Sequence, residues 1–129
     1  RIIIPAKFRE ELGEEVVVTR GMDCCLNIYT KEQWNTLLEQ LTKLPSTKAD
    51  ARKFVRAMGA KTAHVEIDAQ GRIKLPLNLI ALAHLEKECM VVGVLNYVEI
   101  WAKDKYEAMD AESNEAFETI AESLTEFML

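Results

Sequence analysis

The sequence predicts an α+β fold made from two copies of one unit that contains strands and helices. Three observations support this prediction: a duplicated arginine–aliphatic–proline segment, apolar residues with strand-like patterns, and apolar residues at helical spacing. Of the 129 residues, 49% are hydrophobic and 29% are charged, which is typical of a globular protein able to bury its own core. No apolar run approaches the roughly 18 residues that a membrane span requires.

The duplication begins at residues 1–5, which read Arg-Ile-Ile-Ile-Pro and reappear at 72–76 as Arg-Ile-Lys-Leu-Pro. After one inserted residue the offset of 71 becomes 72, and further pairs match: Gly21 with Gly93, Ile28 with Ile100, Lys31 with Lys103, and Trp34 with Tyr106. We therefore expect residues 1–29 and 63–101 to form two halves of one β-barrel related by a pseudo-twofold axis. Residues 2–4 and 73–75 should then occupy equivalent positions.

Local signals place the strands of each copy. Pro5 and Pro76 end the first strands and suit the first turn of a short helix, which Gly13 ends in the first copy. Continuous apolar residues at 16–18 and 89–92 predict central strands, whose partners are residues 25–29 and 97–101. Apolar and polar residues alternate at 65–67 and 73–75, on either side of a turn at residues 68–71.

Three helices complete the prediction. Thr30 and Gln33 form a capping box for a helix over 31–44, and Thr47 and Asp50 cap a second helix over 47–58, both outside the barrel. The third, at 113–129, is acidic and amphipathic and needs a partner surface. We therefore divide the chain into a first repeat with two helices (1–62), a second repeat (63–112) and a tail (113–129). Because Arg1 lies within a strand-like run, we interpret the first repeat as incomplete at its N-terminus.

The charge of the chain is unevenly distributed. The net charge of -5 includes a tail, residues 104–129, with eight acidic residues and one lysine, so residues 1–103 carry +2. Residues 43–61 alone hold six basic residues and only Asp50 as an acidic one. The overall acidity therefore does not exclude an anionic partner. We interpret the basic helix around Lys48 and Arg56 as a solvated face and leave it outside the candidate site.

The sequence favours a non-enzymatic protein that uses no cofactor or metal ion. It contains no phosphate-binding loop, no G-x-S-x-G and no H-E-x-x-H. The three cysteines, Cys24, Cys25 and Cys89, cannot all pair and lack metal-ligand spacing, which points to a reducing compartment. His64 and His84 are interpreted as ordinary histidines. We interpret three aromatic residues as part of the core: Trp34, Trp101 and Tyr106.

The segment Asp68-Ala-Gln-Gly-Arg72, followed by Ile-Lys-Leu-Pro, resembles the D-x-x-x-R signature of the MraZ family. Further resemblance lies at residues 1–13, 17–21, 93–96 and 99–101, so it covers essentially the whole chain. It implies a bacterial transcriptional regulator with an AbrB-like swapped-hairpin β-barrel, located in the cytoplasm with the nucleoid. It also implies a ring-shaped homo-oligomer that binds direct repeats in double-stranded DNA upstream of cell-division and cell-wall genes.

The candidate DNA-binding residues are Arg1, Arg72 and Lys74, and the resemblance places both arginines at the motif position of each half. Arg72 follows a tight turn and should point outward, because Ile73 and Leu75 take the inner face. An arginine so placed can bind guanine O6 and N7 or clamp a phosphate. Asp68 is expected to form the turn and orient Arg72, and Gly71 to permit the turn.

A second function class stays open, namely an oligomeric protein-interaction scaffold that does not bind nucleic acid. It is supported by the net negative charge and by the amphipathic tail. The duplicated arginine favours DNA binding over this alternative.

Overall fold

A computed structural model, which describes residues 1–128, shows the predicted unit twice in the same order. The first copy contains β1 (Ile2–Ile3), α1 (Ala6–Leu12), β2 (Glu15–Arg20), β3 (Leu26–Thr30) and α2 (Lys31–Thr42). After α3 (Ala49–Ala60) and β4 (Thr62–Glu66), the second copy contains β5 (Arg72–Ile73), α4 (Leu77–Leu82), β6 (Cys89–Val94), β7 (Tyr97–Ala102) and α5 (Lys103–Glu115). The chain continues into α6 (Phe117–Ser123) and a 3-10 turn, η1 (Thr125–Phe127).

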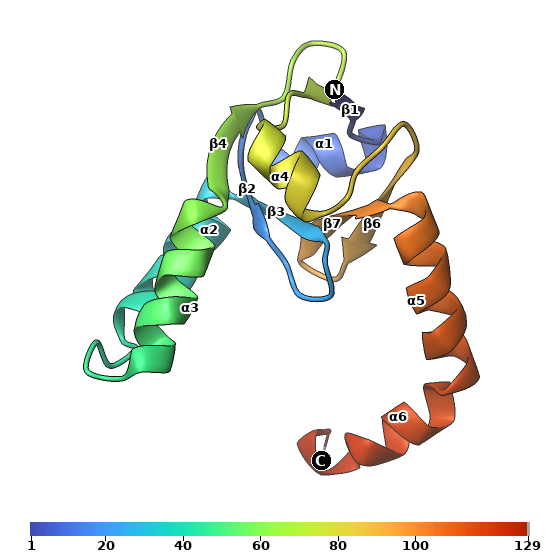
Figure 1. The fold of residues 1–129 in the computed structure, drawn as a ribbon. Coiled ribbons are helices and arrows are strands. Elements are labelled where there is room, and N and C mark those ends of the chain that lie inside the picture. Colours follow the sequence, from blue (N-terminus) through green and yellow to red (C-terminus); the bar gives the residue numbers. More distant parts are fainter. Residues whose placement is uncertain (129) are drawn as a thin grey trace.

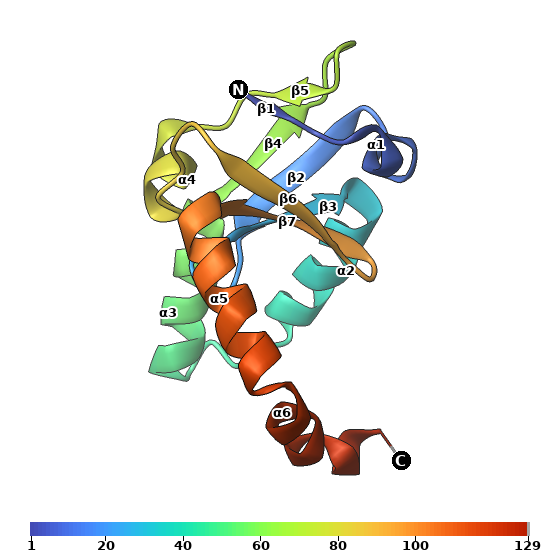
Figure 2. The same ribbon diagram turned by 90° about the vertical axis from the view of Figure 1, so that its right-hand side faces the viewer.

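The strands form two antiparallel sheets. β1 pairs with β5 in a two-stranded ribbon, and the other strands form a five-stranded sheet in the order β4-β2-β3-β7-β6. The ribbon, α1 and α4 lie over one face of this sheet (Figure 2). The main core fills the space between them and includes Ile4, Val18, Ile73 and Ile100, each at most 1% exposed. On the opposite face a smaller core joins Val17 to the α2 and α3 helices.

The strand registers reveal the pseudo-twofold relation between the halves. In the ribbon Ile2 lies opposite Ile73, and these two residues are equivalent at the offset of 71. In the large sheet Asn27 lies opposite Glu99, which are equivalent at the offset of 72. An axis that passes through both pairs exchanges the two copies, so residues 2–4 and 73–75 are equivalent as predicted. Side-chain hydrogen bonds repeat the relation, because Asn27 donates to the Tyr29 hydroxyl and the Trp101 indole donates to Glu99.

Three expectations about the strands need correction. Among residues 1–128 the strands form two separate sheets, of two and five strands, and no closed barrel. Residues 89–92 belong to β6, an edge strand, since β6 pairs only with β7 in this part of the chain. The hairpin registers also place Gly93 where the first half has Arg20, because the second turn is one residue shorter.

The helix starts agree with the sequence at α2 and differ at α3. The Thr30 hydroxyl accepts from the Gln33 backbone N–H, and the Gln33 side-chain oxygen accepts from the Thr30 backbone N–H. These two hydrogen bonds confirm the capping box. The N-cap of α3 is Lys48, without a side-chain hydrogen bond, so Thr47 and Asp50 do not cap this helix. The tail is also not a single helix that starts near residue 113, because α5 ends at Glu115 and α6 follows in a new direction (Figure 1).

Two helical arms leave the sheet, as Figure 1 shows. The α2–α3 hairpin packs with α2 on β2 and β3, while α5 packs on β6 and β7 and carries α6 away from the sheet. Trp34 and Trp101 are buried as predicted, and Tyr106 stands edge-on against Trp101. Among the described residues, no helix is both long and apolar enough to cross a membrane.

Candidate nucleic-acid interface

The β1–β5 ribbon brings the three predicted DNA-binding residues to one surface. Ile73 is buried and turns inward, and Ile2 packs against the same core. Ile3 pairs with Arg72, and continuing this register places Arg1 opposite Lys74. Directly opposed residues share a face and alternate residues along a strand return to it, so all four side chains belong to the outer face of the ribbon. Arg1 and Lys74 are exposed, and Arg72 is partly exposed.

The turn between β4 and β5 fixes the position of Arg72. The Asp68 carboxylate accepts from the backbone N–H groups of Gln70 and Arg72 through one oxygen, at 2.9 and 2.8 Å. Its other oxygen accepts from the Arg72 Nε at 3.0 Å. The backbones of Asp68 and Arg72 also bond to each other at 2.9 Å. Asp68 therefore bonds both to the backbone of the turn and to the side chain of Arg72.

The same hydrogen bonds set the electrostatics of the turn. The backbone N–H of Arg72 is the largest of several causes that hold the pKa of Asp68 below its usual value. The guanidinium of Arg72 adds to this effect. The ion pair itself is open to water, with side chains 39% and 36% exposed, so it contributes to orientation more than to stability. Arg72 keeps its Nη1 free of any hydrogen bond to residues 1–128, and Nη2 contacts only Gln70, at 3.4 Å.

Gly71 has the backbone conformation that favours glycine in this turn. Its φ of 80° lies in the left-handed region, and the guanidinium of Arg9 lies so close that a Cβ atom would displace it. Arg9 belongs to α1, donates from Nε to the Ile4 carbonyl at 2.6 Å, and so covers the turn. Arg9 gave no signal in the sequence, because its contact with a turn 62 residues later is purely tertiary. At the offset of 71 its equivalent is Ile80, so the repeat gave no signal for it.

Ile3 is a second residue that sequence reasoning missed. Its side chain is 62% exposed in the centre of the basic outer face, an unusual place for a large aliphatic residue. A signal was available, since Ile3 is the repeat equivalent of Lys74, which was assigned to the outer face. The ribbon therefore presents three cationic side chains around one exposed apolar group.

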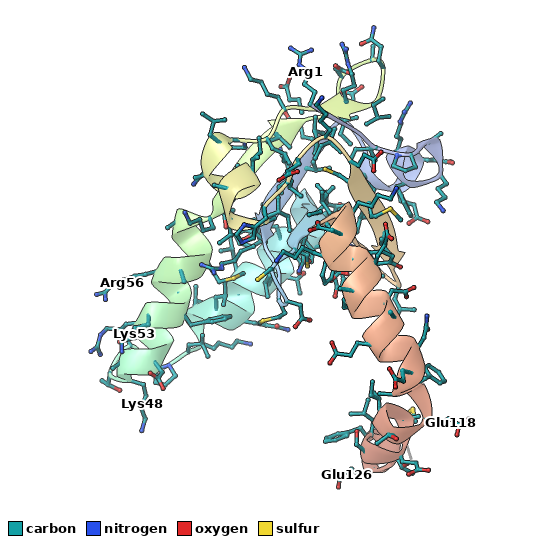
Figure 3. All side chains as sticks on the ribbon, turned by 45° about the vertical axis from the view of Figure 1, so that its right-hand side comes forward. Arg1, Lys48, Lys53, Arg56, Glu118 and Glu126 are labelled. Carbon is teal, nitrogen blue, oxygen red and sulfur yellow. The ribbon has the colours of Figure 1, made fainter. Side chains whose placement is uncertain are left out.

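The surroundings of Arg1 differ from those of Arg72. Arg1 borders an open hollow whose lining combines four acidic residues, Glu86, Glu88, Asp104 and Glu107, with Lys87 and Lys103. Lys103 forms an ion pair with Glu88, so the charges of this lining partly offset one another. The other basic cluster, on α3, is remote from the ribbon: Figure 3 places Lys48, Lys53 and Arg56 at the opposite end of the molecule from Arg1.

The remaining chemically reactive side chains form no second site. Cys25 is buried, and its burial, reinforced by Glu99, raises its pKa to about 12, whereas Cys24 is exposed in the adjoining turn. His64 and His84 are both exposed. Within residues 1–128, no group of three or more histidine, cysteine and acidic side chains could hold a metal ion.

Comparison with known proteins identifies the family. The family model described as "MraZ protein, putative antitoxin-like" matches twice, over residues 1–57 and 58–128. A curated protein of Ligilactobacillus salivarius (strain UCC118), named Transcriptional regulator MraZ, is 54% identical over 129 residues, which are 100% of this chain and 90% of that protein. The two matches follow the duplication already seen in the strand registers, and together with the relative they show that the chain belongs to the MraZ family.

Proposed function

We propose that this chain is a DNA-binding transcriptional regulator that reads specific sequences with the β1–β5 ribbon. The observation that carries the proposal is the outer face of the ribbon, where Arg1, Arg72 and Lys74 surround the exposed Ile3. A two-stranded antiparallel ribbon fits the major groove of B-DNA, where base edges can be read. The name of the Ligilactobacillus salivarius relative, Transcriptional regulator MraZ, supports the regulatory role.

Arg72 is the residue best prepared to recognise a base. Asp68 holds its Nε, so the guanidinium enters the groove with a fixed orientation, with Nη1 free and Nη2 in only a long contact with Gln70. Those nitrogens suit guanine O6 and N7, a contact that discriminates against other bases by about 1–3 kcal/mol. Ile3 adds an apolar contact of the kind that recognises the methyl group of thymine.

Arg1 and Lys74 have supporting roles in this proposal. Lys74 contacts phosphate as a point charge, because its ammonium lacks the planar fork of arginine. Arg1, the counterpart of Arg72 in the first half, lies opposite Lys74 on the same outer face and adds a second guanidinium to the contact.

A single ribbon reads too few bases to select a promoter, so the proposal includes self-association. A ring of identical chains would present the same ribbon several times, and linkage between copies would convert weak contacts into useful avidity. Direct repeats upstream of cell-division and cell-wall genes are the matching targets, in the bacterial cytoplasm at the nucleoid. An AbrB-like swapped-hairpin relation between the two repeats, and the division of the chain into 1–62, 63–112 and the tail 113–129, belong to the same proposal.

The test is a comparison of Arg72→Lys and Arg72→Ala, measured by fluorescence anisotropy on a duplex obtained by in vitro selection and on a scrambled duplex. Arg72→Lys keeps the charge but loses the fork, so it should bind the scrambled duplex like the parent and the selected duplex at least about tenfold more weakly. Arg72→Ala should weaken both. Arg20→Ala, a cation loss away from the ribbon, is the matched control and should leave both affinities unchanged.

The alternative function is an oligomeric protein-interaction scaffold without nucleic-acid binding, and the exposed acidic tail is the observation in its favour. A salt series separates the two functions, because release of counterions from DNA makes specific binding fall steeply as salt rises. If in vitro selection yields no enriched sequence, or if Arg72→Ala binds as tightly as the parent at equal salt, the DNA-reading proposal is wrong and the scaffold is favoured.

A further inference from the structure

A fourth cation, Arg9, lies beside the ribbon, at the turn that carries Arg72. Arg9 belongs to α1 of the first half, whereas this turn, residues 68–71, belongs to the second half. The guanidinium of Arg9 lies directly against Gly71. Figure 2 shows α1 on the side of the ribbon from which the connection between β4 and β5 projects, and α4 on the other side. The two halves therefore meet at the recognition turn.

Two hydrogen bonds fix the position of Arg9. Its Nε donates to the Ile4 carbonyl at 2.6 Å, and the Ile4 N–H donates to the Gly71 carbonyl at 2.7 Å. Ile4 is fully buried, so both bonds are anchored in the main core. Because Gly71 directly precedes Arg72 in the chain, the two guanidinium groups are held in a defined relation to each other.

The rest of the Arg9 guanidinium has no partner within the described chain. Its two terminal nitrogens donate to no group of residues 1–128, and no carboxylate in this range forms an ion pair with it. An arginine carries five N–H donors, and the four on the terminal nitrogens remain available here. The side chain is partly exposed, so an anion can reach it. A fixed guanidinium with a free pair of nitrogens suits the oxygens of a phosphate.

We propose that Arg9 binds a phosphate of the DNA backbone while the ribbon lies in the major groove. This contact rests on the proposed function and extends the interface from the ribbon to α1. Phosphate contacts beside a reading element set its register on the duplex and carry no sequence information themselves. Arg9 would therefore place the recognition turn against the backbone, and Arg72 would read the base.

The contact has no counterpart in the other half. The pseudo-twofold relation exchanges α1 with α4, whose sequence Leu-Asn-Leu-Ile-Ala-Leu contains no basic residue. The equivalent of Arg9 is Ile80, which packs against the main core. α1 thus supplies a phosphate contact on one side of the ribbon that α4 cannot supply on the other. This difference favours one orientation of each ribbon on the duplex.

Two substitutions test the contact in the full chain, on the selected and the scrambled duplex. Arg9→Gln removes the charge, while its amide can still donate to the Ile4 carbonyl. It should weaken binding to both duplexes on the order of tenfold and leave the ratio of the two affinities unchanged. The slope of log affinity against log salt should become shallower by about 0.9 for each Arg9 that engages a phosphate. Arg9→Lys keeps the charge and should retain the slope of the parent.

The matched control is Arg20→Gln, an equal loss of charge away from the ribbon, which should leave both affinities and the slope unchanged. Thermal unfolding verifies that each variant is folded. A loss confined to the selected duplex, with an unchanged slope, would mean that Arg9 only holds the turn. Unchanged binding to both duplexes would mean that Arg9 does not touch DNA. Either result overturns the proposal.

A methylphosphonate scan of the selected duplex locates the phosphate. Neutralising one phosphate at a time should reveal a position that weakens the parent and has no further effect on Arg9→Gln. Arg9→Lys lacks the fork and should show a smaller loss at the same position, so the scan remains decisive even if Arg9→Gln is unfolded. Absence of such a position overturns the contact. Arg72→Lys is measured alongside: if it loses the preference for the selected duplex while Arg9→Gln binds like the parent, the proposed function stands without this contact.

Discussion

α2 and α5 occupy equivalent places in the two halves, since each begins directly after the second strand of its hairpin. α2 buries Trp34 and turns back through α3, whose Met58 joins the same small core with Val17. α5 begins after Ala102, which makes no side-chain cap, and leads into α6 without burying any residue. The difference teaches that the duplication determines where a helix starts, while the apolar residues it carries determine whether the helix packs on its own chain.

The largest expected effect comes from the equivalent aromatics of these helices. Trp34→Ala should lower the free energy of unfolding by about 3–5 kcal/mol, because the indole is 6% exposed and central to its core. Tyr106→Ala should lower it by only about 1–2 kcal/mol, since Tyr106 is half-buried and loses mainly one edge contact with Trp101. Urea unfolding of both variants checks the difference. Equal losses would mean that α5 is held by its own chain as firmly as α2.

A second comparison concerns the residues that end α1 and α4. Gly13, with φ 79° and ψ -160°, occupies a region open almost only to glycine, so Gly13→Ala should cost about 1–3 kcal/mol. Its repeat equivalent is His84, which has a φ of 54° although it is not glycine. His84→Gly removes that strain and should raise the midpoint of thermal unfolding slightly. A destabilised His84→Gly variant would show that the imidazole makes a contact worth more than the strain.

The helix starts provide a third comparison. Among the helices of residues 1–128, α2 alone has a capping box, so Thr30→Ala should lower the free energy of unfolding by about 1 kcal/mol. Gln33→Ala should have a similar effect and should also free the turn of the second hairpin, because the Gln33 amide donates to the Asn96 carbonyl. Chemical denaturation measures both losses. Thr36→Ala, a hydroxyl loss within the same helix, is the control and should change the stability by less.

The fold was predictable wherever short-range chemistry determines it. Prolines at 5 and 76, Gly13, and the Thr30–Gln33 box were recognised because each acts on its own neighbours in the chain. The strand at 89–92 was misplaced for the opposite reason: an apolar run indicates a strand but carries no information on how many partners pair with it. The N-cap of α3 was missed because Thr47 and Asp50 match the pattern without adopting the required backbone.

The candidate site divides in the same way. Asp68, Gly71 and Arg72 form a local turn, so their geometry followed from the sequence. Arg9 could not be found, because its position over Gly71 depends on how α1 meets a distant turn. The outward position of Ile3 could have been predicted, because Ile3 is the repeat counterpart of Lys74. It was missed because a large apolar residue is usually assigned to the core. Equivalence between the repeats therefore predicts which face of the ribbon a residue occupies, even where its residue type suggests the other face.

The smallest expected effect is the pH dependence of stability that the Asp68–Arg72 turn produces. The hydrogen bonds from the Arg72 and Gln70 backbones keep the pKa of Asp68 lower in the folded chain than in the unfolded one. The stabilisation is therefore fully present above the unfolded value, about 3.9, and is lost as the pH falls through the lower folded value. Asp68→Asn cannot titrate, so its stability should approach that of the parent between about pH 6 and pH 2.5.

The measurement is thermal unfolding of the parent and Asp68→Asn as a function of pH, since other carboxylates, such as Glu15 beside Lys31, titrate equally in both chains. A difference between the two that stays constant across this range would mean that the carboxylate charge contributes nothing to the turn. Arg1→Ala offers the comparison with the other half, because no carboxylate of residues 1–128 pairs with Arg1. Its pH profile should therefore parallel that of the parent, because the Asp68–Arg72 turn is unchanged in this variant.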